Sequence, residues 1–280
     1  NVMSVSLLRL KSGKIALFYL VKNSLNECRP YVRISADEAG TWSEPRLVVA
    51  APGYFVLNND RVIQLTNGRL VVPVAFHRSR HTDTNNYDYK NVFDSRALDL
   101  WYLSGDEGQT WVESETWLAA PAHCRSGLQE PGVVELANGK VFSWARTTLG
   151  MQYGCTSDDG GKMWSDPEPT SLQSPCSPAS IKRLPGSSDL LAIYNDHSGD
   201  FPFVAGKRTP LVAGISSDDG KTWTKRKVLE SDPEGWYCYT AIHFVDDAVL
   251  LAYCAGNKKV GGGLSRTRIR RVGLDWLRQP

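Results

Sequence analysis

The chain has 280 residues, of which 41% are hydrophobic, and a net charge of +2. This length and composition allow one large core, so we expect a single domain over residues 1–280. The small net charge and the lack of a Lys/Arg run argue against a nucleic-acid partner, and no apolar stretch is long enough to form a membrane-spanning helix.

The six cysteines show no CxxC or His-rich spacing, so we expect no metal site and no other cofactor. Buried free thiols are the simplest interpretation of most of them. Cys238 and Cys254 differ, because they flank the turn at Asp246 and Asp247 symmetrically and could face each other across a hairpin. The sequence assigns no compartment.

Five predicted hairpins follow one another along the chain. Each has an apolar strand, a short turn, often with glycine, and a second apolar strand, at residues 6–20, 62–76, 133–145, 181–194 and 241–253. Asn-Gly between apolar runs, as at Asn67-Gly68 and Asn138-Gly139, is a strong signal for a two-residue hairpin turn. Helical periodicity is absent, and 15 Pro with 24 Gly oppose long helices. The prediction is an all-β fold.

An eight-residue pattern, Ser-x-Asp-x-Gly-x-Thr-Trp, follows each of the first four hairpins. The copies are Ser35–Trp42, Ser104–Trp111, Ser157–Trp164 and Ser216–Trp223. Ser and Asp side chains can bond the backbone of a tight turn, Gly can take positive φ, and Trp can pack beneath. Ala39 and Met163 depart from the pattern at its Gly and Thr positions, so we expect slightly altered turns there.

This pattern is the Asp box, and the chain resembles the sialidase-like propellers that carry it. Each of the first four hairpins is followed by a strand, an Asp box and a last strand, which gives four-stranded modules, and the fifth ends in a strand at 267–273 without a box. Five such modules predict a β-propeller of four-stranded blades. The resemblance implies six blades, with an arginine and an acid/base carboxylate in the first. We expect that blade to be missing, with a five-bladed form as the alternative.

Strand alternation predicts which residues face the mouth of such a propeller. The Asp boxes and hairpin turns should share one end of each sheet, so site residues should lie seven or eight residues from a turn, at the other end. This register selects seven polar residues, namely Asp60, Glu130, Tyr239, His77, Arg146, Arg29 and Arg208.

The resemblance to sialidases implies roles for four of these positions. Gln129-Glu130-Pro-Gly-Val-Val-Glu-Leu-Ala-Asn-Gly139 followed by Ala145-Arg146 matches the family's glutamate and arginine, Lys207-Arg208 occupies the place of a second arginine, and Tyr239-Thr-Ala-Ile resembles the run at the nucleophile. Tyr239 would be the nucleophile and Glu130 its base, because a phenol with an ordinary pKa near ~10 needs a carboxylate to take its proton. Arg146 and Arg208 would bind the substrate carboxylate.

The remaining candidates have both functional and structural interpretations. Asp60 could touch ligand or belong to an Asx turn, His77 could act at the rim or be structural, and Arg29 could complete the arginine set or pair with Asp60. The polar stretch 78–96 joins the second and third strands of its module, and its length and composition favour contact with a sugar.

The resulting prediction is a sialidase-like exo-glycosidase that acts on a glycan or a small acidic-sugar substrate. Two alternatives stay open at this point. One is a hydrolase for another acidic sugar, such as a different ulosonic acid or a uronate, because arginines recognise a carboxylate rather than sialic acid as such. The other is a glycan-binding propeller without catalysis.

Overall fold

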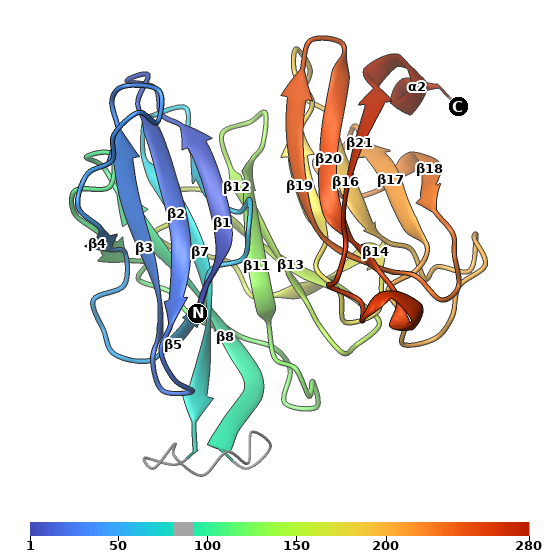
Figure 1. Cartoon of the computed structure of the whole chain (residues 1–280), viewed down its shortest axis with the longest axis horizontal. Helices are drawn as coiled ribbons and strands as arrows, with labels where there is room; N and C mark the ends of the chain where they lie inside the picture. The colour runs from blue at the N-terminus through green and yellow to red at the C-terminus, as the bar shows by residue number, and fades with distance from the viewer. Residues whose placement is uncertain (81–91, 280) are drawn as a thin grey trace. The chain divides into compact units, whose positions relative to one another are not determined.

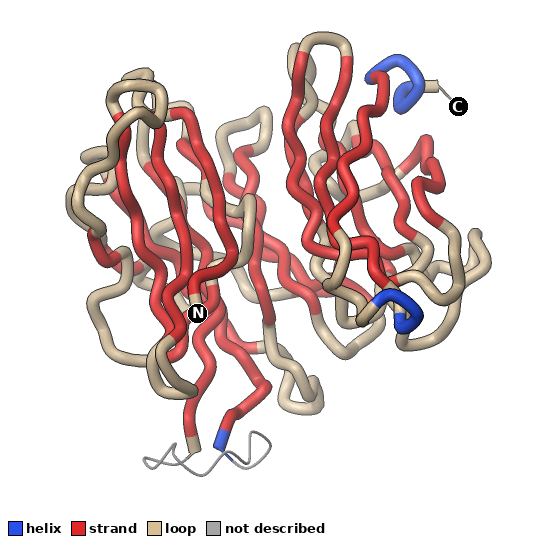
Figure 2. The backbone as a smooth tube through the Cα atoms, in the orientation of Figure 1, coloured by secondary structure: helices blue, strands red, loops and turns tan. Residues whose placement is uncertain are grey.

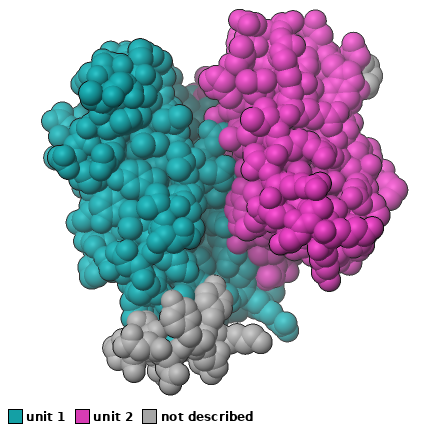
Figure 3. Space-filling view, viewed as in Figure 1, with its two compact units in different colours: residues 1–135, 139–143, 155–167 teal, residues 136–138, 144–154, 168–280 magenta. Residues whose placement is uncertain are grey.

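The computed structural model of the chain describes residues 1–80 and 92–279, which fold mainly into β-strands (Figures 1 and 2). Two short helical elements lie near the C-terminus, η1 (Lys258–Val260) and α2 (Leu274–Arg278). The predicted all-β fold is confirmed. By its contacts the chain divides into two compact units, residues 1–135, 139–143 and 155–167 in the first and residues 136–138, 144–154 and 168–280 in the second (Figure 3). The single-domain interpretation stays a prediction.

The first unit contains the first two modules. Their strands are β1 (Val2–Arg9), β2 (Ile15–Lys22), β3 (Cys28–Ser35), β4 (Arg46–Leu47), β5 (Tyr54–Val56), β6 (Ile63–Gln64), β7 (Leu70–Ser79), β8 (Phe93–Ser104), β9 (Val112–Glu113) and β10 (Leu118–Ala119). The order is β1-β2-β3-β5-β7-β8-β10, with β4 on β3, β6 on β7 and β9 on β8. The two modules are therefore joined by β5, which bridges Cys28 of β3 through Tyr54 and pairs with β7.

The third module is a four-stranded sheet with the order β11-β12-β13-β14, and its residues are divided between the two units. Its strands are β11 (Gln129–Glu135), β12 (Val141–Arg146), β13 (Met151–Ser157) and β14 (Glu168–Gln173). The second unit also holds a four-stranded sheet of β15 (Ser180–Arg183), β16 (Leu190–Asn195), β17 (Leu211–Ser216) and β18 (Thr224–Glu230), and a three-stranded one of β19 (Trp236–Val245), β20 (Ala248–Gly256) and β21 (Thr267–Gly273). The predicted hairpins and the last strand at 267–273 are confirmed, but the last module has three strands rather than the four expected of every module.

Each unit has its own apolar core. In β2 every second residue is buried, with Ala16, Phe18 and Leu20 fully inaccessible, as expected for a strand with one covered face. In β16 and β17 every residue is buried, so both faces of these strands are covered. This burial supplies the main driving force for folding, at about 25 cal/mol per Å² of apolar surface.

The four Asp boxes form the same hydrogen-bonded turn. In each, the Ser hydroxyl donates to the Asp Oδ1 at 2.7–2.8 Å and accepts the backbone N–H of the fifth residue at 2.8–2.9 Å. The Asp Oδ1 also accepts the N–H of the seventh residue at 2.8–3.0 Å. Three boxes add a Thr hydroxyl donating to the Asp Oδ2, a bond that Met163 cannot make. The predicted structural role of these aspartates is confirmed.

The register places the boxes beside the hairpin turns. Ser35 lies opposite Ile15, Ser104 opposite Leu70, and Ser216 opposite Leu190. These three boxes therefore start at the end of their sheets where the first hairpin of the module turns, as predicted. A site at the opposite end of these sheets and the closure of the modules into a ring stay predictions.

Candidate functional site

Two arginines of the second unit meet at one backbone carbonyl. Arg146 is the last residue of β12, and Arg208 lies three residues before β17. Arg146 Nη1 and Arg208 Nη2 both donate to the carbonyl oxygen of Cys176, over 3.5 and 3.4 Å. These are long distances for N–H···O bonds. The sequence places both arginines at one end of their sheets, and their side chains converge there.

An aromatic pair lies against Arg208. The Arg208 guanidinium carbon is 5.0 Å from the ring centroid of Trp236 and 5.4 Å from that of Tyr239. Both distances are in the cation–π range. The candidate nucleophile and one candidate arginine are thus in direct contact. Trp236 was not predicted as a site residue, although the aromatic run Trp236-Tyr237-Cys238-Tyr239 at the start of β19 is a visible signal.

Tyr239 lies in a β-bulge with a strained backbone. The pairing of β19 with β20 shifts between Cys238 and Ala241, so two residues oppose one, and Tyr239 has a φ of 58°. Such a φ is costly for a non-glycine residue and is concentrated at functional sites. The bulge turns the Tyr239 side chain out of the ordinary strand alternation.

The same conformation recurs at the corresponding register of other modules. Ser4 has a φ of 58° within a register shift of β1, Asp60 has a φ of 58°, and Glu130 has a φ of 51°. Three of the residues selected from the sequence before the hairpin turns therefore share one strained backbone conformation. The conformation is therefore a repeated backbone feature of the segments that lead into the hairpins.

A pair of thiols lies next to Arg208. Cys238 and Cys254 are directly opposed in β19 and β20, as anticipated, and all six cysteines are free. The hydrogen bond from Cys238 lowers the pKa of Cys254 to about 7; burial opposes this shift and the Arg208 charge adds to it. The hydrogen bond to Cys254, and then burial, raise the pKa of Cys238. Cys254 is therefore the more acidic thiol.

The candidates of the first unit have different surroundings. Glu130 is the second residue of β11 and is half-buried. The Asp60 backbone N–H donates to the Ser6 hydroxyl at 2.6 Å, and the Asn59 N–H donates to the Asn58 Oδ1 at 2.9 Å. The Asx-turn interpretation of Asp60 stays a prediction. Tyr239 belongs to the second unit, and its pairing with Glu130 stays a prediction.

Arg29 and His77 have structural surroundings. Arg29 forms an ion pair with Glu27 at 2.9 Å and donates to the Ala50 carbonyl, so its carboxylate partner is Glu27 rather than the suggested Asp60. Glu27 is only two residues away in the chain, so it reaches the Arg29 guanidinium through local geometry. His77 is 6% exposed, its Nδ1 lies 3.1 Å from the Asp94 carbonyl, and its ring stacks on Phe93. This favours the structural interpretation of His77.

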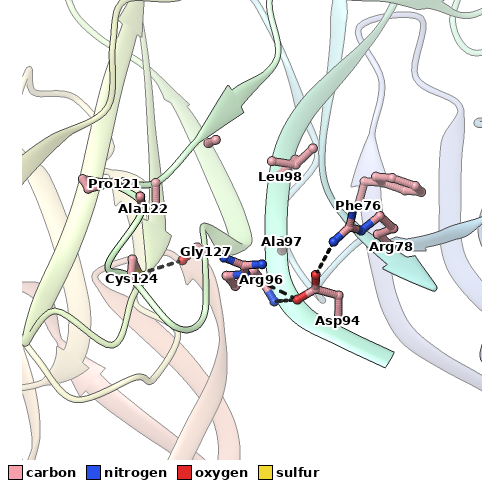
Figure 4. Close-up of a pocket in the computed structure, with 12 residues that line it drawn as sticks. Phe76, Arg78, Asp94, Arg96, Ala97, Leu98, Pro121, Ala122, Cys124 and Gly127 are labelled. Carbon is pink, nitrogen blue, oxygen red and sulfur yellow. Dashed lines mark hydrogen bonds and ion pairs between the residues drawn. The ribbon is translucent and has the colours of Figure 1, made fainter. Parts of the chain in front are cut away.

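Two charged clusters were not found from the sequence. In the second unit, the buried Asp196 accepts the Tyr194 hydroxyl at 2.9 Å and Arg226 Nη1 at 3.0 Å. In the first unit, Asp94 is surrounded by arginines beside a pocket (Figure 4). These arginines lie at the ends of the polar stretch 78–96, whose middle, residues 81–91, lies outside the described residues.

Within residues 1–80 and 92–279, no group of three or more His, Cys, Asp or Glu side chains is arranged to hold a metal ion. Among the same residues, no helix has the length and apolar character to cross a membrane.

A family model described as a BNR repeat-like domain matches residues 3–251. The chain belongs to this family. No protein of curated function matches it. The solved structures that are similar to it include sialidases. A Hadza microbial sialidase has a TM-score of 0.70 at 19% identity, and the match covers 98% of this chain and 53% of the sialidase chain.

Two further structures define the fold of this family member. Trypanosoma rangeli sialidase has a TM-score of 0.66 at 16% identity, and the match covers 99% of this chain and 45% of the sialidase chain. That structure is a complex with 2,3-difluorosialic acid and is described as a covalent intermediate. A protein of unknown function from Dyadobacter fermentans has a TM-score of 0.51 at 18% identity and covers 96% of this chain and 93% of its own. The chain thus has the sialidase β-propeller fold and spans about half the length of these sialidases.

Proposed function

We propose that this chain carries the binding and nucleophilic groups of a sialidase-like exo-glycosidase, which removes a terminal acidic sugar with retention of configuration. The observation that carries the proposal is the convergence of Arg146 and Arg208 on one acceptor, with Tyr239 against Arg208. The sialidase fold supports it.

The arginine pair suits a substrate carboxylate. Guanidinium groups stay charged and present planar forks of donors, which match the two oxygens of a carboxylate. The bonds from both arginines to the neutral Cys176 carbonyl are long for N–H···O bonds. A bound carboxylate would accept shorter, charge-assisted bonds from the same guanidinium groups.

Tyr239 suits attack on a carbon that bears a carboxylate. The anomeric carbon of sialic acid carries such a group, which would repel an anionic Asp or Glu nucleophile, whereas a phenol approaches as a neutral group. In the proposed reaction the Tyr239 oxygen bonds to the anomeric carbon as the glycosidic bond breaks. The phenolic proton passes to Glu130, and water then releases the sugar from Tyr239. The group that protonates the leaving oxygen is unassigned.

A second candidate substrate is another acidic sugar, such as a different ulosonic acid or a uronate. The arginine pair recognises the carboxylate, and nothing in it selects the rest of the sugar. A glycan-binding propeller without turnover is the third candidate, and the similar Dyadobacter protein leaves the function of a chain of this length open.

The experiment that tests the proposal compares binding with turnover. We expect the protein to bind N-acetylneuraminic acid more tightly than neutral galactose in calorimetry and to hydrolyse an aryl α-sialoside in preference to an aryl β-glucuronide. Tyr239→Phe should lose turnover and keep binding, because only the reacting oxygen is removed. Preference for the glucuronide would select the second candidate, and binding without turnover would select the third.

A further inference from the structure

A pocket of about 290 Å³ lies in the first unit, between the adjoining ends of β7 and β8 and the segment that leads from β10 to β11 (Figure 4). One side carries the charged residues Arg78, Asp94 and Arg96, and the rest is mostly apolar, with Phe76, Leu98 and the small residues of segment 119–122. A second cavity of about 260 Å³ shares Asp94 and Arg96 with it. The two cavities therefore form one cleft around this ion-pair cluster.

Three guanidinium groups surround a single carboxylate in this cleft. Arg78 Nη2 lies 3.1 Å from Asp94 Oδ2, while Arg80 Nη2 and Arg96 Nε lie 3.3 and 3.6 Å from Oδ1. Burial raises the pKa of Asp94, but the Arg96 backbone N–H and the Arg78 and Arg80 side chains outweigh it, so the carboxyl is ionised at neutral pH. One negative charge thus faces three positive charges.

The excess charge exceeds what the fold requires. The Asp94 side chain is only 5% exposed, and one arginine would compensate it. The arginine side chains are 48–66% exposed, and among the described residues they have no second carboxylate partner. Arg125 and His123 line the adjoining cavity and add no negative charge. Each guanidinium has five N–H donors, so most of them are open to a ligand.

We propose that this cleft binds a monosaccharide that carries a sulfate or phosphate ester. A tetrahedral oxyanion presents three outer oxygens, which suits donors that arrive from three backbone positions better than a planar carboxylate does. The apolar floor formed by Phe76, Leu98 and small side chains suits the hydrophobic face of a sugar ring. All lining residues of this cleft belong to the first unit, whereas Arg146 and Arg208 belong to the second.

Direct binding to the whole chain tests the proposal without relying on turnover. Calorimetry at low salt compares galactose 6-sulfate, galactose 6-phosphate, galacturonate and galactose. The two esters should bind at least about tenfold more tightly than galactose, and galacturonate should bind more weakly than the esters but more tightly than galactose. The ester that binds more tightly identifies the ligand as a sulfated or a phosphorylated sugar. Equal binding of galactose and both esters would overturn the proposal.

Variants locate the site. Arg80→Gln and Arg96→Gln should each weaken ester binding about tenfold, whereas Arg46→Gln, an exposed arginine on β4, should leave it unchanged. Arg80→Lys keeps the charge and the local fold but loses the planar fork, and should give an intermediate loss. Arg208→Gln should leave the affinity for the two esters unchanged, because Arg208 does not line this cleft. If Arg46→Gln weakens binding as much as Arg96→Gln does, or if Arg208→Gln abolishes it, the cluster only anchors Asp94 and the proposal is wrong.

Discussion

Arg146 and Arg208, which are 62 residues apart in the chain, donate to the same carbonyl oxygen, that of Cys176. They come from different sheets, since Arg146 ends β12 and Arg208 precedes β17. Two like charges held at one acceptor repel each other unless an anion joins them. This arrangement is the basis of the proposed carboxylate clamp.

The clamp predicts a large loss of affinity when either arginine is neutralised. Arg146→Gln and Arg208→Gln should each weaken binding of N-acetylneuraminic acid by about 10- to 100-fold, since a charge-assisted bond contributes about 1.5–3 kcal/mol. Calorimetry measures the affinity. Arg266→Gln is the matched control, because Arg266 is exposed in the second unit. Equal losses in all three variants would contradict the clamp.

The thiols beside Arg208 predict a site-selective reaction. The pKa of Cys254 is lowered to about 7 by the Cys238 hydrogen bond, whereas burial raises the pKa of Cys28 to about 11. The thiolate is the nucleophile, so iodoacetamide at pH 7.5 should label Cys254 well before Cys28. Peptide mass spectrometry over a pH series gives both rates. In Cys238→Ala, which removes the donor, reaction at Cys254 should shift to higher pH, and faster labelling of Cys28 would refute the assignment.

The first Asp box predicts a stabilising substitution. Ala39 has a φ of 69° at the position where the other boxes have glycine, with φ of 85–95°. Ala39→Gly should raise the free energy of unfolding by ~0.5–1 kcal/mol, because glycine takes positive φ without steric cost. Gly108→Ala should do the reverse, since its Cβ would lie 3.3 Å from Trp111. Urea unfolding measures both, and a loss of stability in Ala39→Gly would count against the strain.

The boxes also predict acid sensitivity with a defined sign. Hydrogen bonds from Thr41 lower the pKa of Asp37 to about 2, and for Asp106 burial opposes the shift but bonds from Thr110 prevail, also giving about 2. The unfolded value is near ~3.9. The stabilisation is therefore complete above pH ~4 and is lost as pH falls towards about 2.

Melting temperatures between pH 6 and pH 2 test this dependence. Asp106→Asn should melt lower than the parent at pH 6, and the difference should shrink towards pH 2, where the parent carboxylate is protonated. Asp275→Asn, at an exposed carboxylate of α2, serves as the control. A difference that stays constant down to pH 2 would show that the Asp106 charge does not act as described.

The sequence predicted the features that local interactions determine. An Asp box closes within eight residues through bonds from Ser104 and Asp106 to nearby N–H groups, so its pattern is readable without tertiary information. The opposition of Cys238 and Cys254 follows from the symmetry of one hairpin. Residues at a fixed distance from the turns, such as Tyr239, could be selected for the same reason.

The features that depend on distant packing were missed. The bridge through β5 rests on three residues, too few to show strand periodicity. Arg226 and Asp196 are 30 residues apart, and the Asp94 cluster gathers arginines from both sides of a long connection. Sequence alone also suggested Asp60 as a partner for Arg29, where the nearer Glu27 binds it.

The most direct test of the proposed mechanism is covalent trapping with 2,3-difluorosialic acid, the compound in the Trypanosoma rangeli complex. Fluoride leaves without needing a proton, so the reagent tests the nucleophile independently of the unassigned acid. We predict that peptide mass spectrometry finds one equivalent of sugar on Tyr239 and none in Tyr239→Phe. The account would be contradicted by an adduct on another residue. It would also be contradicted if the protein hydrolyses sialosides but Tyr239 stays unmodified after prolonged incubation with the reagent.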